Sequence, residues 1–259
     1  NNSASSCDAT KEGSLKYNLS TNKFYGCDGT DWTELSTVPV SFGNDAYTKL
    51  LLHMDDVSLS DSSSFVHAIT KNGNAVRSNT QSKFGSYSSY FDGTGDYLSI
   101  SDSEDFNLGN QDFTIDCWVY SSNFATGTYQ TIVGQWDASN SGSFVIYITE
   151  TGNVSVMIAD GTGIRGGIIS NVVLTNNVWH HIAYVRDGNN FKLYIDGVAD
   201  SNTATSSSTA YNTNIDLTIG RIEYSTMYLY FNGYIDEVRI SKGVARWTSN
   251  FTPPTEPYS

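Results

Sequence analysis

Apolar and polar residues alternate along most of the chain, in runs that are short. In the run Asp112–Tyr120, every second residue from Phe113 to Val119 is apolar. Because side chains on a strand point alternately to its two faces, this run predicts a strand with one face in the core. The opposite face carries Thr114, Asp116, Trp118 and Tyr120, a mixture that predicts a half-exposed surface.

Similar runs follow one another at short intervals, with Gly, Asn and Asp turns between them. No window keeps a period of 3.6 residues, and the chain has 4 prolines. This pattern predicts an all-β fold, a two-sheet antiparallel jelly-roll sandwich. The predicted strands are Lys49–Met54, Ser86–Phe91, Tyr97–Ile100, Asp112–Tyr120, Thr131–Trp136, Phe144–Thr149, Val154–Ala159, Trp179–Arg186, Phe191–Ile195, Ile215–Ile219 and Tyr234–Ile240.

The first forty residues differ from the rest and predict a separate hairpin module. Two alternating segments, 13–18 and 23–27, are joined by the turn-rich stretch 19–22. A two-stranded hairpin is marginal on its own, and a disulfide between Cys7 and Cys27 would stabilise it. A metal or redox pair is the alternative, but neither cysteine has the close Cys or His neighbours that zinc requires. We therefore expect a disulfide-stapled module and linker in residues 1–40 and a sandwich in 41–259.

The composition and charge of the chain exclude two classes of partner. Lys and Arg number 14 against 27 for Asp and Glu, which gives a net charge of −13. Such a chain repels phosphate backbones, so nucleic acid is excluded as a partner. No apolar run approaches the ~18 residues of a membrane span, so no membrane insertion is expected. A disulfide would place the protein in an oxidising, extracellular setting, and the remaining Cys117 is expected to be a small buried hydrophobe.

Four segments resemble laminin G-like domains of the concanavalin A-like lectin/glucanase group. Asp92–Ile100 is similar to their DGxGDYL strand, and Asp112–Val119 is similar to the strand that follows it. Trp179–Gly197 resembles their most specific signature, WHHxAxxR…LYxDG, and Gly233–Ser241 resembles the closing strand. The resemblance implies two antiparallel sheets in a jelly roll. It also implies a structural role for His181 against the core.

A narrower resemblance concerns the two ends of the sandwich. Leu51–Asp55 and Ser241–Pro254 look like the versions found in phage tail and marine viral structural proteins. This resemblance implies an extracellular or virion-surface location. It also implies partners among other copies of the chain, or among other subunits of a virion or filament.

The glucanase branch of the group cleaves glycans with carboxylates on alternate positions of one strand, in E-x-D-x-x-E or E-x-D-x-E patterns. Retaining chemistry needs two carboxyl groups about 5–5.5 Å apart. No such pattern is present, and the adjacent Asp236 and Glu237 are expected to point to opposite faces. The sequence therefore predicts no enzymatic activity, and no catalytic residue is assigned.

Calcium is the one cofactor expected, since many members of the family carry it. Ca²⁺ prefers six to eight oxygen ligands, often from Asp in loops. In a jelly roll the first and last strands are neighbours, which would bring Asp55 and Asp56 near Asp236 and Glu237. The alternative is that Asp55 and Asp56 begin a solvated loop and Asp236 caps a turn.

Sugar binding needs an aromatic platform with polar groups at its rim. We expect Trp118, Tyr120, Trp136 and Tyr147 to lie on neighbouring strands and to form one, with the polar loop 137–143 beside them. The alternative is that Trp118 and Trp136 pack under loops.

The leading hypothesis is a non-enzymatic lectin-like domain that binds cell-surface or extracellular glycan. An architectural subunit, with Met227–Phe231 as an interface, is the second hypothesis, and a glycoside hydrolase is the third.

Overall fold

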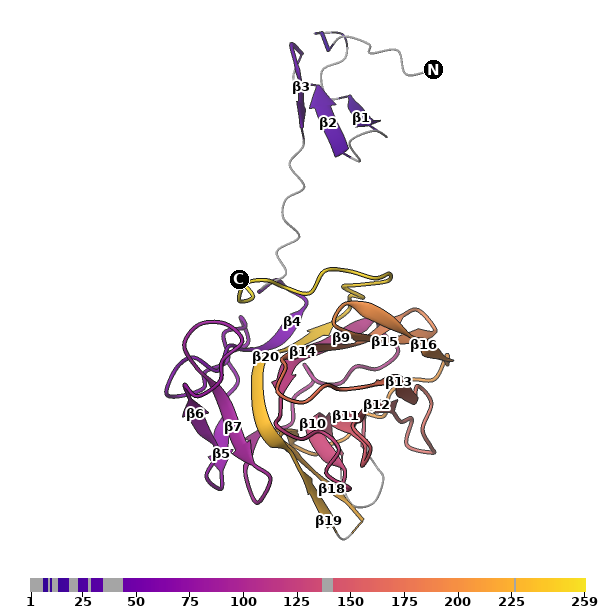
Figure 1. Ribbon diagram of the computed structural model, residues 1–259. Helices are drawn as coiled ribbons and strands as arrows, with labels where there is room; N and C mark the ends of the chain where they lie inside the picture. The colour runs from indigo at the N-terminus through magenta and orange to yellow at the C-terminus, as the bar shows by residue number, and fades with distance from the viewer. Residues whose placement is uncertain are drawn as a thin grey trace. The chain divides into compact units, whose positions relative to one another are not determined.

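A computed structural model describes residues 7–8, 10, 14–18, 23–27, 29–34, 44–136, 142–225 and 227–259. The chain divides into two compact units, residues 1–42 with residue 259, and residues 43–258 (Figure 1). The described residues form no helix, so they include none that could span a membrane.

The small unit contains three antiparallel strands, β1 (Leu15–Asn18), β2 (Lys23–Cys27) and β3 (Trp32–Glu34). The first two form the predicted hairpin, whereas β3 was not predicted because three residues are too few for alternation to show. A disulfide joins Cys7 to Cys27, with the Cα atoms 5.5 Å apart. The predicted turn at 19–22 and the predicted linker lie outside the described residues.

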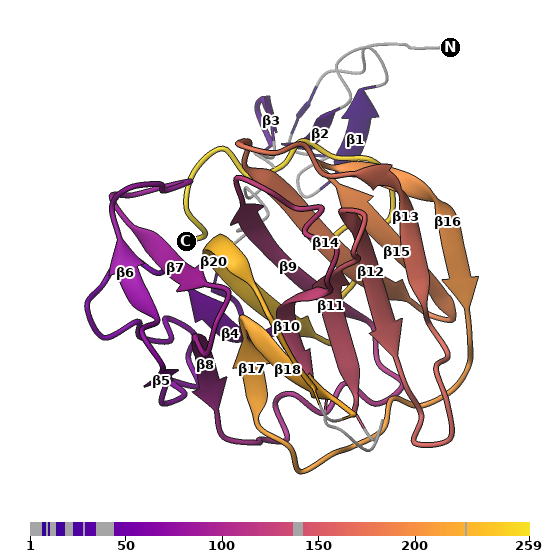
Figure 2. The same cartoon turned by 60° about the horizontal axis from the view of Figure 1, so that its bottom comes forward.

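The large unit is a sandwich of two antiparallel sheets (Figures 1 and 2). The seven-stranded sheet has the order β13 (Ile168–Val173), β12 (Asn153–Ile158), β11 (Phe144–Ile148), β10 (Gln130–Gln135), β17 (Leu217–Ile219), β8 (Tyr97–Ile100) and β5 (Thr70–Asn72). The eight-stranded sheet has the order β16 (Val198–Thr205), β15 (Asn190–Ile195), β14 (His180–Asp187), β9 (Phe113–Tyr120), β20 (Asn232–Lys242), β7 (Ser88–Asp92) and β6 (Val76–Ser78), with β4 (Thr48–Leu52) paired to β20.

The core lies between the sheets and follows the predicted alternation. Phe113, Ile115, Cys117 and Val119 of β9 are fully buried in it, as predicted. Burial raises the pKa of the Cys117 thiol, which keeps it protonated. The first and last strands are neighbours, since β4 pairs antiparallel with β20. The predicted all-β sandwich is therefore confirmed.

The second face of β9 differs from the prediction, because it is buried rather than half-exposed. Thr114 and Asp116 are 0% exposed and Trp118 is 5% exposed. The C-terminal segment 244–258 packs over this side of the eight-stranded sheet, where Trp247 and Phe251 lie against His181. Alternation shows which residues share a face, but it does not show which distant segment covers that face.

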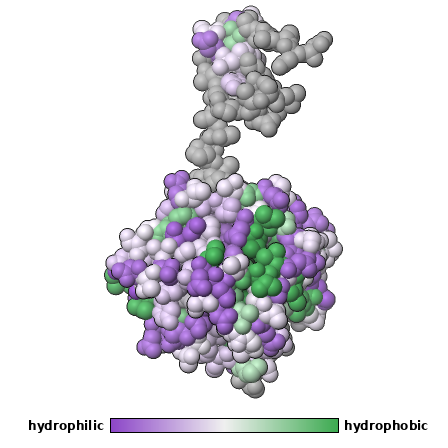
Figure 3. Space-filling view, in the orientation of Figure 1, coloured by the Kyte–Doolittle hydropathy of each residue, from purple (hydrophilic) through white to green (hydrophobic). Residues whose placement is uncertain are grey.

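The strands that were not predicted lie mainly at edges. β5, β6, β13 and β16 are short or largely polar, and β18 (Arg221–Tyr224) and β19 (Met227–Tyr230) form a separate hairpin that packs on β10. Large hydrophobic side chains stay exposed on β13, including Ile169, Val172 and Val173. Figure 3 shows hydrophobic side chains gathered in a strip across an otherwise mostly hydrophilic surface of the sandwich.

Candidate functional site

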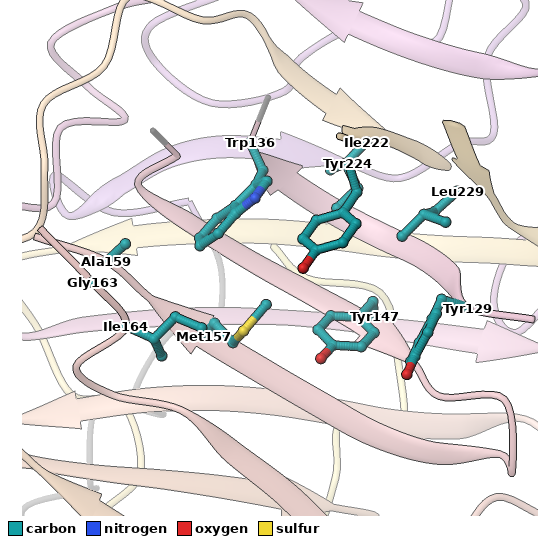
Figure 4. A pocket seen from close by; sticks show the side chains of 10 residues that line it. All are labelled: Tyr129, Trp136, Tyr147, Met157, Ala159, Gly163, Ile164, Ile222, Tyr224 and Leu229. Carbon is teal, nitrogen blue, oxygen red and sulfur yellow. The ribbon is translucent and has the colours of Figure 1, made fainter. Parts of the chain in front are cut away.

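An aromatic pocket of about 500 Å³ opens on the outer face of the seven-stranded sheet, at β10–β12 and beneath the β18–β19 hairpin (Figure 4). Its residues come from these strands and from the loop after β12. They are Tyr129, Trp136, Tyr147, Met157, Ala159, Gly163, Ile164, Ile222, Tyr224 and Leu229. None of the ten carries a charge, so the pocket suits the apolar face of an uncharged ring.

Strand alternation places the floor of this pocket. On β11, Phe144 and Ile146 point into the core while Val145 and Tyr147 point outward. Trp136 follows β10 directly and packs with Val145 in a small cluster separate from the main core. Tyr129 meets Tyr147 edge to face, with ring centroids 5.7 Å apart and planes at 72°. These contacts fix the orientation of the aromatic rings before any ligand binds.

The walls are more exposed than the floor. Trp136 is 4% exposed, whereas Tyr129, Tyr224 and Ile164 at the rim are 41%, 43% and 51% exposed. Burial raises the pKa of Tyr147, as do the nearby Tyr129 and Tyr224. The Tyr147 hydroxyl therefore stays protonated at neutral pH, so it can both donate and accept a hydrogen bond.

A smaller polar pocket of about 120 Å³ adjoins the first, since Trp136 lines both. Its other residues are Tyr97, Ser99, Ile215, Asp216, Thr218, Arg221 and Glu223. The Arg221 guanidinium lies between two rings, 3.9 Å from the centroid of Tyr97 and 4.6 Å from that of Tyr228. The Trp136 indole therefore lies between an aromatic pocket and a pocket with hydrogen-bonding groups.

The structure brings together two of the four predicted aromatic residues. Trp136 and Tyr147 line the same pocket, and the Trp136 side chain also packs under the β18–β19 hairpin through Ile222. Trp118 and Tyr120 are on β9, in the other sheet, so the expectation that all four lie on neighbouring strands is wrong. Sequence order placed β9 next to β10, but the chain crosses between sheets at that point.

The other sheet gives Trp118 and Tyr120 different surroundings. Trp118 packs edge to face on Phe84, with centroids 5.8 Å apart, and Lys83 Nζ lies 3.8 Å from its ring centroid. Tyr120 contacts Trp179 and Tyr234. Neither residue lines the two pockets described above.

Sequence reasoning missed two aromatic residues of the site. Tyr129 lies one residue before β10, outside any alternating run, and Tyr224 belongs to an unusually aromatic stretch with Tyr228 and Tyr230. That stretch is a usable signal, but the subunit interface predicted from the sequence covers only its part Met227–Phe231. Of the polar loop expected beside the platform, residues 137–141 lie outside the described residues.

The four carboxylates expected at a calcium site each have hydrogen-bond donors. Asp55 Oδ1 accepts from the backbone N–H groups of Ser86 and Tyr87, at 2.9 and 3.0 Å, and Asp56 accepts within its own loop. Asp236 accepts from Lys83 N–H at 2.9 Å, and Glu237 pairs with His53 at 2.9 Å. Among the residues that the structure describes, no three His, Cys, Asp or Glu side chains form a metal-binding group. Calcium binding stays a prediction.

Asp236 and Glu237 are both fully buried, at 0% exposed. Burial, with the neighbouring charges of Glu237 and Asp55, raises the pKa of Asp236 to about 8 against the opposing hydrogen bonds from Lys83 and Phe84. The pair is adjacent on β20 and closed off from solvent. A polysaccharide has no access to carboxyl groups in that position.

Solved structures of similar fold include binding domains of toxins and a domain of an enzyme. The binding domain of the Paraclostridial mosquitocidal protein 1 is 16% identical, with a TM-score of 0.60, over 76% of this chain and 49% of that one. The botulinum neurotoxin serotype G binding domain is 14% identical, with a TM-score of 0.56, over 76% and 48%. The chain spans about half the length of these toxin domains.

A third structure is matched over nearly its whole length. It is domain 4 of a GH43 extracellular arabinanase from Geobacillus stearothermophilus, in complex with arabinotriose, with 20% identity and a TM-score of 0.57 over 78% of this chain and 95% of that one. No curated protein matches the chain. The family model for the concanavalin A-like lectin/glucanases superfamily matches residues 92–248, more than half of the sequence. Together with the jelly-roll sandwich, this match shows that the chain belongs to the concanavalin A-like lectin/glucanases superfamily.

Proposed function

We propose that the chain is a non-catalytic domain that binds glycans on the outer face of its seven-stranded sheet. The observation that carries this proposal is the uncharged pocket in which Tyr129, Trp136, Tyr147 and Tyr224 converge. Sugar rings have apolar faces that stack on aromatic side chains and hydroxyl groups that need polar partners at the rim. The aromatic pocket supplies the first and the adjoining polar pocket supplies the second.

The comparisons support this proposal at the level of the fold. Two similar structures are binding domains of toxins, and a third, matched over 95% of its length, is an arabinanase domain in complex with arabinotriose. A disulfide in the small unit supports an extracellular setting. We extend the proposal to attachment, on a virion or another extracellular surface, because the ends of the sandwich resemble viral structural proteins.

The test is to remove single rings of the pocket. Replacing Tyr224 or Tyr147 by Ala should weaken binding to a responsive glycan on an array about tenfold, because each loses one stacking contact. Tyr47→Ala is the matched control, since Tyr47 is 48% exposed and lines neither pocket. Tyr120→Ala, on the opposite sheet, should also leave binding unchanged. Equal binding by all four variants would remove this face as the glycan site.

The hydrolase alternative rests on Asp236 and Glu237, and their burial argues against it. Incubation with the glycan that binds should release no reducing sugar. Release that Asp236→Asn abolishes would overturn the proposal of a non-catalytic domain.

An architectural subunit remains the second candidate, because the hairpin exposes apolar surface. Met227 and Tyr228 on β19 are 58% and 50% exposed. If they form an interface between copies, sedimentation should show an oligomer that Met227→Lys dissociates. A concentration-independent monomer would argue against that role.

A further inference from the structure

Two buried donor groups beside the polar pocket have no acceptor among the described residues. They are the indole Nε1–H of Trp136 and the Nε–H of Arg221. Both residues line this pocket, and Trp136 is 4% exposed. Buried donors are almost always paired, because an unpaired one loses its bond to water and gains nothing. Figure 4 shows the indole nitrogen on the edge of the ring that lies nearer to Tyr224 of β18.

The same pocket also carries acceptors. Asp216 and Glu223 are carboxylates that accept hydrogen bonds, and neither forms an ion pair with Arg221 within the described part of the chain. Arg221 instead stacks between Tyr97 and Tyr228, which holds its planar fork in place. Fixed donors and acceptors therefore line one small cavity of about 120 Å³.

A sugar hydroxyl is the group that matches such a lining, because it donates and accepts at once. A carboxylate ligand would meet Arg221 favourably, but it would also meet Asp216 and Glu223 in the same pocket. The net charge of −13 adds repulsion at long range. The charges thus favour an uncharged ligand over an acidic one.

We propose that the polar pocket is a hydroxyl-binding subsite, which makes the site selective for neutral glycans. A sugar ring stacks in the aromatic pocket, and its own hydroxyls or those of the next residue enter the polar pocket beside Trp136. There Trp136 Nε1–H and the Arg221 guanidinium donate hydrogen bonds to hydroxyl oxygens. Asp216 and Glu223 accept hydrogen bonds from hydroxyl groups. Arg221 and Glu223 are the specificity-determining residues. This inference rests on the proposed glycan-binding function.

The test compares matched neutral and acidic probes. Galactotriose and trigalacturonate differ in carrying a hydroxymethyl or a carboxylate group on each ring, and arabinotriose and xylotriose widen the neutral set. Calorimetry with the full chain should show binding to at least one neutral trisaccharide, and trigalacturonate should bind at least tenfold more weakly than galactotriose.

Substitutions then separate the two pockets. Glu223→Gln and Arg221→Gln should each weaken binding of the responsive neutral trisaccharide about tenfold. Glu223→Gln should also reduce the difference in affinity between that trisaccharide and trigalacturonate. Glu256→Gln, an exposed carboxylate outside both pockets, should change neither. Melting temperatures confirm folding, and Glu223→Gln keeps the test valid if the arginine variant fails to fold.

The outcomes are distinguishable. Binding that needs Tyr147 but is unaffected by Glu223→Gln and Arg221→Gln, or a preference for trigalacturonate, would overturn the hydroxyl subsite and leave the proposed function intact. Failure to bind any glycan on an array would overturn both.

Discussion

At the scale of single residues, the most consequential group is a buried ion pair between the outer face of β9 and β20. Arg239 contacts Asp116 through two hydrogen bonds of 3.0 Å, and both side chains are 0% exposed. Tyr258 donates a further hydrogen bond to Asp116. Burial alone would raise the pKa of Asp116, but the Arg239 charge and the hydrogen bonds from His181 and Arg239 lower it to about 2. The pair is therefore ionised over the whole physiological range.

Replacing Asp116 by Asn should destabilise the sandwich strongly. The substitution leaves the Arg239 charge buried without its counter-ion, and breaking one partner of such a pair costs about 3–5 kcal/mol. Urea unfolding should show this loss in the free energy of unfolding. Asp187→Asn, at an exposed turn, is the control and should change it by less than about 0.5 kcal/mol. A small effect at Asp116 would mean that the pair is solvated in solution.

Asp236 makes stability depend on pH in the opposite direction from a typical carboxylate. Its pKa is raised to about 8 in the folded state, so the folded chain keeps a proton that the unfolded chain loses near pH 4. Unfolding then releases a proton, and the free energy of unfolding falls as pH rises from about 4 to 8. A hydrogen bond from His53 to Glu237 raises the pKa of His53, and its contribution is likewise lost as pH rises, but only above about 6.5.

The contributions of Asp236 and His53 can be separated by measuring the free energy of unfolding as a function of pH. Between pH 5 and 6.5 only Asp236 should contribute a downward slope, and Asp236→Asn should remove it. Above pH 6.5 the slope that remains in the Asp236→Asn variant should belong to His53, and it should disappear when His53→Gln is added to that variant. Chemical denaturation at intervals of half a pH unit measures both, and a slope that survives in the Asp236 variant would show that the carboxyl group ionises normally.

Single residues also mark where sequence reasoning succeeded. Alternation placed Phe113 and Cys117 in the core, because both are set by the strand that carries them. It could not place Asp116, whose partners Arg239 and Tyr258 are more than a hundred positions away. The indole of Trp136 finds no acceptor within the described part of the chain, and this was equally out of reach, since a missing acceptor is a property of the folded surroundings.

At the scale of elements, long alternating strands were predictable and short edge strands were not. β9 and β14 were found within one or two residues, because each is a run of eight strand positions, alternating in β9 and fairly apolar on both faces in β14. β18 and β19 were missed as strands, although they form a wall of the aromatic pocket. The apolar run Met227–Phe231 suggested an interface, since no local pattern shows a hairpin folding back over a sheet.

The small unit depends on its disulfide more than on packing. Among its residues whose burial is described, only Cys7 and Cys27 are buried. The two cysteines are 20 positions apart, and closing a loop of that size stabilises a chain by about 3 kcal/mol. We expect reduction, or Cys7→Ala with Cys27→Ala, to unfold residues 1–42 and to leave the sandwich folded.

Hydrogen exchange measures this prediction segment by segment. Amides of β1–β3 should lose protection on reduction, while amides of β9 and β14 keep theirs. Cys117→Ser, at a buried position in the sandwich, is the control. It should lower the protection of amides in β9 and β14 and leave the protection of β1–β3 unchanged. Retained protection in the small unit after reduction would show that its strands are stable without the covalent link.

At the scale of the whole molecule, charge and site size set how the chain can attach to a surface. A net charge of −13 is repelled by anionic cell surfaces, and the repulsion is screened beyond about 10 Å at 0.1 M salt. Contact at short range therefore has to come from the two pockets. Their volumes of about 500 and 120 Å³ match one or two sugar rings rather than a long polymer.

A site of that size gives weak binding to one glycan, so attachment should depend on the number of copies displayed. Linking several copies raises avidity by about 10²–10⁴ without any new contact, provided the spacing allows simultaneous engagement. We expect a streptavidin tetramer of the chain, biotinylated at its N-terminus, to bind a glycan-coated surface at least a hundredfold more tightly than the monomer. Surface plasmon resonance at several glycan densities measures the difference.

The dependence on glycan density distinguishes avidity from tight binding at a single site. Two sites on one tetramer can engage together only when the immobilised glycans are close enough, so the tetramer should lose its advantage on a sparse surface. A Tyr147→Ala tetramer should fall below the wild-type tetramer by more than the monomers differ, because each contact is weakened. Equal affinity of monomer and tetramer at every density would mean that a single chain holds its partner tightly. Such tight binding would need an interface larger than the two pockets, and it would favour the architectural role over attachment.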